Sequence, residues 1–301
     1  MPQPSSPSPA ASADTPLDTL AVRRHERRLL RADSAPWLHQ EVARRMAEKL
    51  SLIKLQPQTV VQWGARLGGS QAELLQVYPQ ARQIWVERDA GRAPGDWRAM
   101  LPSWLGGRPG IQQTTPSEVT PESAELLWAN MVLHGSAQPS VLMQAWLRAL
   151  KVDGFVMFSC LGPDSFVELR PLFAQAGWGP VAPPWIDMHD LGDDLVRAGF
   201  AEPVMDQERI TLTWGTPERL LADLRAIGGN VASARFQGLR TPGWRRRLLA
   251  AFETLRGPDG LLHLSLEVIY GHAIKPIARL QVAPETHVSL EQMRAQLRGR
   301  Q

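Results

Sequence analysis

The residues from 151 to 170, KVDGFVMFSCLGPDSFVELR, constrain the fold more than any other stretch of the chain. Phe155 to Cys160 form a nearly continuous apolar run, which is typical of a strand covered on both faces of a sheet. Asp153 and Gly154 precede the run as a turn, because glycine tolerates the positive φ angle that ends a preceding helix. The stretch therefore predicts a buried central strand.

A small polar loop follows this predicted strand. Leu161 to Asp164 break the apolar run, and Asp164 or Ser165 is predicted to cap a helix that carries Glu168 to Arg170. Open α/β sheets bind ligands at the carboxyl ends of parallel strands, so the loop is a candidate wall of a binding site. An ordinary connection between a strand and a helix explains the same pattern equally well.

Further strands and helices alternate along the chain. Apolar residues recur at every fourth position from Leu38 to Leu50, which indicates a helix. Strands are predicted at 59–63, 82–87, 125–129, 208–214 and 262–268, and helices at 38–50, 72–77, 141–150, 188–200, 216–228 and 244–256. Alternating strands and helices are typical of an α/β fold, and the last two strands have antiparallel character.

We therefore expect one α/β domain over residues 17–280, with a seven-stranded sheet, helices on both faces and an N-terminal helical segment. Residues 216–260 are predicted to form a helical insertion before the last strand. The start of the chain is rich in Pro and Ser and predicts a disordered tail over 1–16, while 281–301 is predicted to be a C-terminal extension.

Composition excludes several classes of protein. No run approaches the roughly 18 apolar residues of a membrane span, so no membrane association is expected. The single Cys160 excludes a disulfide framework and a multi-cysteine zinc site, and its apolar surroundings predict a buried, inert thiol. No metal site is expected. The N-terminus lacks the basic-then-apolar pattern of a signal peptide, which favours a cytoplasmic protein.

The basic character of the chain comes mostly from arginine, in two clusters. The second cluster falls in the predicted insertion, and its members are Arg235, Arg240, Arg245, Arg246 and Arg247. The first lies near the start and contains Arg23, Arg24, Arg27, Arg28 and Arg31. Such clusters are either solvated helix faces or a docking surface for an acidic partner. Nucleic acid is not expected, because no stacking aromatics are interleaved with the basic residues.

A glycine-containing loop, Gly64 to Ser70, follows the first predicted strand and lies where a nucleotide-type cofactor binds in this class of fold. Glu87 ends the next strand, 23 residues after Gly64, where an acid can accept hydrogen bonds from both ribose hydroxyls. This pattern alone leaves open whether the loop binds a cofactor or is only a turn.

Six segments carry a family resemblance: FSCLGPDSFVELR (158–170), MHDLGDDLVRAGF (188–200), MDQERITLTW (205–214), LLADLRAIGGN (220–230), GLRT (238–241) and EVIYGHAIKP (267–276). With them, residues from about 35 to 275 resemble the class I S-adenosylmethionine-dependent methyltransferases, and among these the malonyl-acyl-carrier-protein O-methyltransferases of biotin synthesis. The resemblance implies a methyltransferase-like fold, S-adenosylmethionine as cofactor and malonyl-loaded acyl carrier protein as substrate and partner.

The resemblance also implies where the cofactor binds. Gly64, Gly68 and Glu87 match the family's cofactor motif, and Gly69 belongs to the same loop. The chain departs from the family pattern at several places. Gln62 stands where the family usually has Asp, and Arg66 replaces the middle glycine. The acid usual after the third strand has no clear match in 112–119, and the Tyr usual in the N-terminal helical segment is not apparent near 30–36. Arg66 is expected either to pair with the methionine carboxylate of the cofactor or to fill the pocket.

The reaction that the resemblance implies needs few catalytic groups. A malonyl carboxylate is already a nucleophile at neutral pH, so the enzyme has to align it and exclude water. Asn130, His134 and Ser159 are the polar residues expected around the reacting groups, although they are equally explained as a turn cap, a helix start and a strand-end hydroxyl.

Three functions fit these observations. The first is methyl transfer to malonyl-acyl carrier protein, with the arginines of the insertion (Arg235, Arg240 and Arg245 to Arg247) docking the acidic carrier. The second is a non-catalytic protein of the same fold that binds the carrier or an enzyme of biotin synthesis, which Gln62 and Arg66 favour. The third is a methyltransferase that acts on a different small acid.

Overall fold

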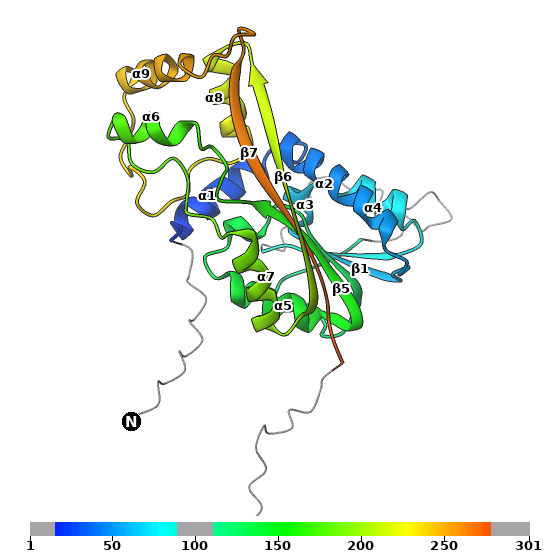
Figure 1. Cartoon of the computed structure of the whole chain (residues 1–301). Helices are drawn as coiled ribbons and strands as arrows, with labels where there is room; N and C mark the ends of the chain where they lie inside the picture. The colour runs from blue at the N-terminus through cyan, green and yellow to red at the C-terminus, as the bar shows by residue number, and fades with distance from the viewer. Residues whose placement is uncertain (1–15, 89–110, 278–301) are drawn as a thin grey trace, which may run out of the picture.

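The computed structural model describes residues 16–88 and 111–277 of the chain (Figure 1). The tail predicted for 1–16, except Pro16, and the extension predicted for 281–301 lie outside the described residues. Within the described ranges, no helix combines the length and the apolar character that crossing a bilayer requires.

The core of the protein is a seven-stranded sheet with the strand order β3-β2-β1-β4-β5-β7-β6. The first five strands along the chain pair in parallel, and β7 pairs antiparallel with both β5 and β6. The strands are β1 Thr59–Trp63, β2 Arg82–Val86, β3 Gln112–Thr114, β4 Ala124–Ala129, β5 Leu150–Leu161, β6 Ala201–Trp214 and β7 Leu262–Ile274. The predicted seven-stranded sheet with two late antiparallel strands is confirmed.

Helices cover both faces of this sheet, as predicted. They are α1 Thr19–Leu29, α2 Trp37–Lys49, α3 Ala65–Gly68, α4 Gln71–Val77, α5 Pro139–Ala149, α6 Leu169–Gln175, α7 Met188–Ala198, α8 Pro217–Ala226 and α9 Pro242–Glu253. The start of α8 follows the sequence closely, since Thr216 caps it by accepting a hydrogen bond from the Arg219 backbone N–H, and Pro217 occupies its first turn.

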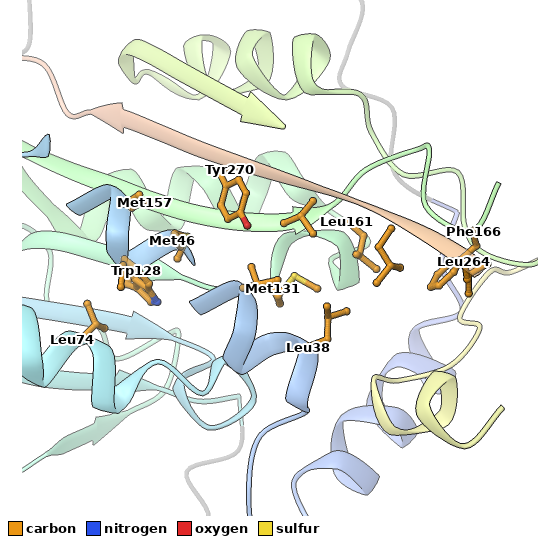
Figure 2. Packing of buried hydrophobic residues seen from close by; sticks show 14 of the residues in the cluster. Leu38, Met46, Leu74, Trp128, Met131, Met157, Leu161, Phe166, Leu264 and Tyr270 are labelled. Atoms are coloured by element: carbon orange, nitrogen blue, oxygen red, sulfur yellow. The ribbon is translucent and has the colours of Figure 1, made fainter. Parts of the chain in front are cut away.

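Alternate residues of the central strands point to opposite faces and build two apolar layers. Leu126 and Trp128 of β4 pack in the layer that α2 and α4 cover, while Leu127 and Ala129 pack in the layer that α5 and α7 cover. Figure 2 shows the first layer, in which Met46 of α2 and Leu74 of α4 lie near Trp128, and Leu38 of α2 lies near Met131. Each fully buried Leu or Met there contributes roughly 1.5–3 kcal/mol to folding.

Residues between β6 and β7 carry α8 and α9, and with α6 these helices gather at one end of the molecule (Figure 1). The N-terminal segment is joined to this region rather than to the sheet. Leu17 forms an isolated antiparallel bridge with Ala232, and the Asp18 backbone N–H donates to the Val231 carbonyl at 2.8 Å. The N-terminal segment and the insertion together cover the carboxyl ends of the strands.

The prediction that Asp164 or Ser165 caps the helix after β5 is wrong. Helix α6 begins at Leu169, without a side-chain cap. The loop is instead fastened to β7: the Asp164 backbone N–H donates to Glu267 Oε2 at 2.8 Å, and Ser165 Oγ donates to the Glu267 carbonyl at 3.1 Å. Two of the segments that carried the family resemblance are therefore in contact, and a buried carboxylate holds them together.

The turn predicted at Asp153 and Gly154 also differs in detail. Helix α5 ends at Ala149 and β5 begins at once with Leu150, so no helix-ending turn falls at these residues. The positive φ lies at Asp153, at 63°. Gly154 is needed for another reason, because a Cβ there would lie 2.9 Å from the Lys151 carbonyl oxygen and 3.1 Å from that of Ala124.

Candidate active site

A cavity of about 1,220 Å³ lies at the carboxyl ends of the central strands. Its floor includes Gly64 after β1, Glu87 after β2 and Met131 after β4, and its roof comes from α1, the segment after α6 and the helical insertion. Small-molecule pockets commonly measure about 300–1,000 Å³, so this cavity has room for two ligands side by side. Its position at the strand ends is the one that open α/β sheets use for ligands.

Glu87 and Gly64 form one corner of this cavity. The Glu87 side chain is buried, and its Oε1 accepts a hydrogen bond from the Arg66 backbone N–H at 2.8 Å. Burial raises the pKa of Glu87, and the hydrogen bond from the Arg66 backbone opposes that shift. Gly64 lies in the left-handed region with φ 67° and begins the short helix α3, so the backbone turns sharply at the cavity wall.

Gly68 and Gly69, which the resemblance also assigned to the cofactor, do not line the cavity. A Cβ on Gly68 would lie 3.3 Å from the Asn130 carbonyl oxygen. A Cβ on Gly69, whose φ is 65°, would lie 2.6 Å from the Ala35 Cβ. Both glycines let neighbouring backbone approach the far side of the loop.

At two of the departures from the family motif, the side chain makes a contact inside the fold. The Arg66 side chain donates to the Leu30 carbonyl at 3.1 Å, on the segment that follows α1, and it does not line the cavity. Gln62 Nε2 donates to Gln83 Oε1 at 3.0 Å between two buried side chains of β1 and β2. Of the two expectations for Arg66, the structure does not show it filling the pocket.

Asn130 and Ser159 lie together, and both are buried. Ser159 Oγ donates to Asn130 Oδ1 at 2.6 Å, and Asn130 Nδ2 donates to the carbonyls of His39 at 2.7 Å and Gly68 at 2.6 Å. The pair thus joins the ends of β4 and β5 to helix α2 and to the glycine loop. Neither residue lines the cavity.

His134 does line the cavity, in the short 3₁₀ turn Leu133–Gly135 after β4. Burial, together with the nearby His39, lowers the pKa of His134 to about 3, so the imidazole is neutral at pH 7. Its Nδ1 is buried and has no hydrogen-bond partner among the described residues, and the same is true of Nε1 of Trp185. The two rings meet edge to face with 6.1 Å between their centroids.

Aromatic side chains form the rest of the cavity wall, and the sequence analysis did not identify them. Phe166 contacts Trp185 with 5.9 Å between ring centroids, and Trp178 contacts Trp244 at 5.7 Å. These residues come from the segment after β5 and from the insertion, which are far apart in sequence. The available signal was the high tryptophan content, 11 residues in the chain.

The five arginines of the insertion do not form one surface. Arg235 forms an ion pair with Asp18 at 2.7 Å and so ties the insertion to the N-terminal segment. Arg240 lines the cavity and lies against aromatic rings. Arg245, Arg246 and Arg247 are exposed on α9 and form no ion pair with any residue that the structure describes.

The chain is similar to known methyltransferases along most of its length. It is 38% identical over 259 residues to the malonyl-[acyl-carrier protein] O-methyltransferase of Laribacter hongkongensis, which covers 82% of this chain and 86% of the relative. It is 35% identical over 295 residues to the protein of the same name from Nitrosospira multiformis. This alignment covers 91% of this chain and 96% of the relative.

A solved structure supports the fold alone: the [4+2]-cyclase SpnF aligns with a TM-score of 0.51 and 14% identity over 89% of this chain and 100% of that one. No family model matches the chain. The identity to the curated relatives and its extent over both chains are decisive, and the sheet has the seven strands of a class I methyltransferase. The chain belongs to the malonyl-[acyl-carrier protein] O-methyltransferase family.

Proposed function

We propose that this protein methylates the free carboxylate of malonyl-acyl carrier protein, with S-adenosylmethionine as methyl donor, as a step of biotin synthesis. The observation that carries the proposal is the continuous cavity, which joins the Gly64 and Glu87 corner to an aromatic wall under the insertion. One end has the features of a nucleoside site and the other has an apolar surface for an acyl thioester. The names of the curated relatives support the substrate.

The residues at the Gly64 corner fit the cofactor. Glu87 is a buried acid at the end of β2, with one oxygen on the Arg66 backbone, and it would accept hydrogen bonds from ribose hydroxyls. The backbone turn at Gly64 leaves the wall free of a side chain there. When bound, the cofactor supplies an electrophilic methyl group on a sulfonium centre.

His134 is the polar side chain that we place next to the substrate carboxylate. Its pKa of about 3 keeps the ring uncharged, so it can donate one hydrogen bond without neutralising the nucleophile. A cationic partner would hold the carboxylate's lone pairs more strongly and lower their reactivity. The aromatic wall keeps water out, and methyl transfer then proceeds through proximity and orientation.

Asn130 and Ser159 act as positioning residues in this proposal. Their mutual hydrogen bond and the bonds from Asn130 to two backbone carbonyls hold the glycine loop against β4 and α2. These bonds hold the loop in place without help from a ligand. Gly68 and Gly69 belong to the same arrangement, since they allow the close approach of these elements.

The carrier protein would dock on α9. Acidic carriers are attracted by exposed cations, and Arg245, Arg246 and Arg247 follow the cavity-lining Trp244 directly in the same helix. Such rim charges mainly raise the association rate and are screened by salt.

The test is a methyl-transfer assay with labelled S-adenosylmethionine and malonyl-acyl carrier protein. We expect a base-labile methyl ester on the malonyl carrier and none on acetyl-acyl carrier protein, which lacks the free carboxylate. Calorimetric titration of S-adenosylhomocysteine provides the second arm. A protein that binds the carrier but neither binds S-adenosylhomocysteine nor forms the ester would overturn the proposal and favour a non-catalytic carrier-binding role.

A further inference from the structure

The Arg240 guanidinium lies against two aromatic rings. Its guanidinium carbon lies 3.9 Å from the ring centroid of Phe236 and 4.6 Å from that of Trp244. Its Nη2 donates to the Trp178 carbonyl at 3.0 Å. Three contacts therefore fix both the position and the plane of the guanidinium group, at the wall of the cavity.

Among the described residues, no acid forms an ion pair with Arg240, whereas Arg235 pairs with Asp18. Partial burial lowers the pKa of Arg240, because its surroundings partly desolvate the cation. Only Nη2 has a hydrogen-bond partner among the described residues, so two of the three nitrogens remain available to donate. A fixed cation with free donors in a ligand cavity is suited to bind an oxyanion.

The position of Arg240 indicates which anion it binds. All three of its contacts come from the segment after α6 and from the insertion, and none comes from the strand ends where the methyl donor is expected. The exposed Arg245 to Arg247 follow Arg240 a few residues later in the chain, and the aromatic wall lines the cavity beside it. A substrate delivered by a carrier protein has its phosphodiester at the same junction, between the protein surface and the apolar arm.

We propose that Arg240 is the receptor for the phosphodiester of the phosphopantetheine arm, an inference that rests on the proposed methyl transfer to a carrier-bound acid. The planar fork of arginine matches two phosphate oxygens, and its contacts with Phe236 and Trp244 order the fork before the substrate arrives. The malonyl carboxylate is the less suitable anion, because pairing with a cation would weaken it as a nucleophile.

The experiment compares two small substrates that differ only in the phosphate: malonyl-4′-phosphopantetheine and malonyl-pantetheine. For the unmodified protein we expect kcat/KM to be at least tenfold higher with the phosphorylated substrate. In Arg240→Gln this ratio should fall to near one, and in Arg240→Lys it should take an intermediate value, since Lys keeps the charge and loses the fork. Arg219→Gln, at an exposed arginine of α8 outside the cavity wall, is the matched control and should keep the ratio of the unmodified protein.

Other outcomes would overturn the inference. If the unmodified protein shows nearly equal kcat/KM with the two substrates, it has no phosphate receptor. This result is independent of the variants and holds even if Arg240→Gln fails to fold. Equal losses with both substrates in Arg240→Gln assign the residue to the carboxylate or to the packing of the aromatic wall. If the unmodified protein methylates neither substrate nor the malonyl carrier, the proposed function itself fails, which is a distinct result.

Discussion

Replacing Asn130 with alanine tests whether this residue positions the cofactor loop or acts on the substrate. Asn130 is 1% exposed, and its amide makes hydrogen bonds of 2.7 Å and 2.6 Å to the carbonyls of His39 and Gly68. Its Oδ1 accepts from Ser159 Oγ at 2.6 Å. Alanine removes this amide, so the His39 carbonyl, the Gly68 carbonyl and the Ser159 hydroxyl each lose a hydrogen-bond partner in a buried region.

The cost follows from the number of groups left unsatisfied. A buried polar group without its partner costs about 1–3 kcal/mol. Both carbonyls retain a second lone pair, and the Ser159 hydroxyl still accepts from the Met131 backbone N–H. The lower end of the range therefore applies to each of the three groups, which gives about 3 kcal/mol in total. For a domain of this size the loss corresponds to a fall in Tm of roughly 6–12 °C.

Urea unfolding and S-adenosylhomocysteine titration together decide the question. We expect Asn130→Ala to lose both stability and cofactor affinity, because the loop is no longer held against β4. Ser159→Ala is the matched control and should lose less, since the Met131 backbone N–H still has the Ser159 carbonyl at 3.0 Å. Unchanged stability and unchanged affinity, together with abolished methyl transfer, would refute the positioning role and place Asn130 at the reacting atoms.

Three further changes have defined outcomes. Gly69→Ala should lower the Tm more than Gly260→Ala. Both glycines have positive φ, but only at Gly69 would the new Cβ meet another atom, the Ala35 Cβ at 2.6 Å. Equal falls in Tm would show that the Ala35 contact relaxes freely. The folded pKa of His134, about 3, lies below its unfolded value, so the unfolded state binds more protons between these values and stability falls as pH drops below about 6.5. Urea unfolding at pH 7 and pH 5 measures this fall in the free energy of unfolding. The fall should be smaller in His134→Gln than in the unmodified protein, by up to about 2 kcal/mol. An identical fall in both proteins would show that the ring is not buried in its uncharged form. Glu87→Ala should weaken S-adenosylhomocysteine binding at least tenfold in calorimetry, since hydrogen bonds to a charged group contribute about 1.5–3 kcal/mol each, and unchanged affinity would place the cofactor elsewhere.

Reversing the charge of Arg245, Arg246 and Arg247 together to Glu should slow association with the acyl carrier protein and remove most of its dependence on salt. Stopped-flow binding at two ionic strengths measures both effects, and Arg219→Glu is the control on α8. Association that is unaffected by the triple change would move the docking surface to the N-terminal arginines.

The sheet could be predicted because local patterns agree with the tertiary structure. The parallel strands β1, β2, β4 and β5 are mostly apolar and buried, and each was located from its own sequence. Strand β3 was missed, because Gln112–Thr114 is short and only Thr114 is buried. Strand β6 begins at Ala201 rather than 208, since a strand at the edge of the sheet leaves much of its length exposed and polar.

The candidate site was only partly accessible to the same reasoning. Gly64 and Glu87 could be placed because each directly follows a strand whose end is fixed by the sheet. The direction of the Arg66 side chain depends on the carbonyl of Leu30, which no local pattern in the loop reports. The aromatic wall is a product of tertiary structure, because Trp178 and Trp244 come together only when the insertion folds over the strand ends.

The attachment of the insertion has a consequence for how such enzymes diverge. Residues 215–261 leave the sheet at the end of β6 and return at the start of β7, so they can be exchanged between relatives as one graft without changing the strand order. The bridge from Leu17 to Ala232 and the ion pair from Asp18 to Arg235 mean that the graft must include the first residues of the N-terminal segment. If the proposed assignment of the cavity holds, exchange of this graft would change the acyl-facing wall and leave the Gly64 and Glu87 corner in place.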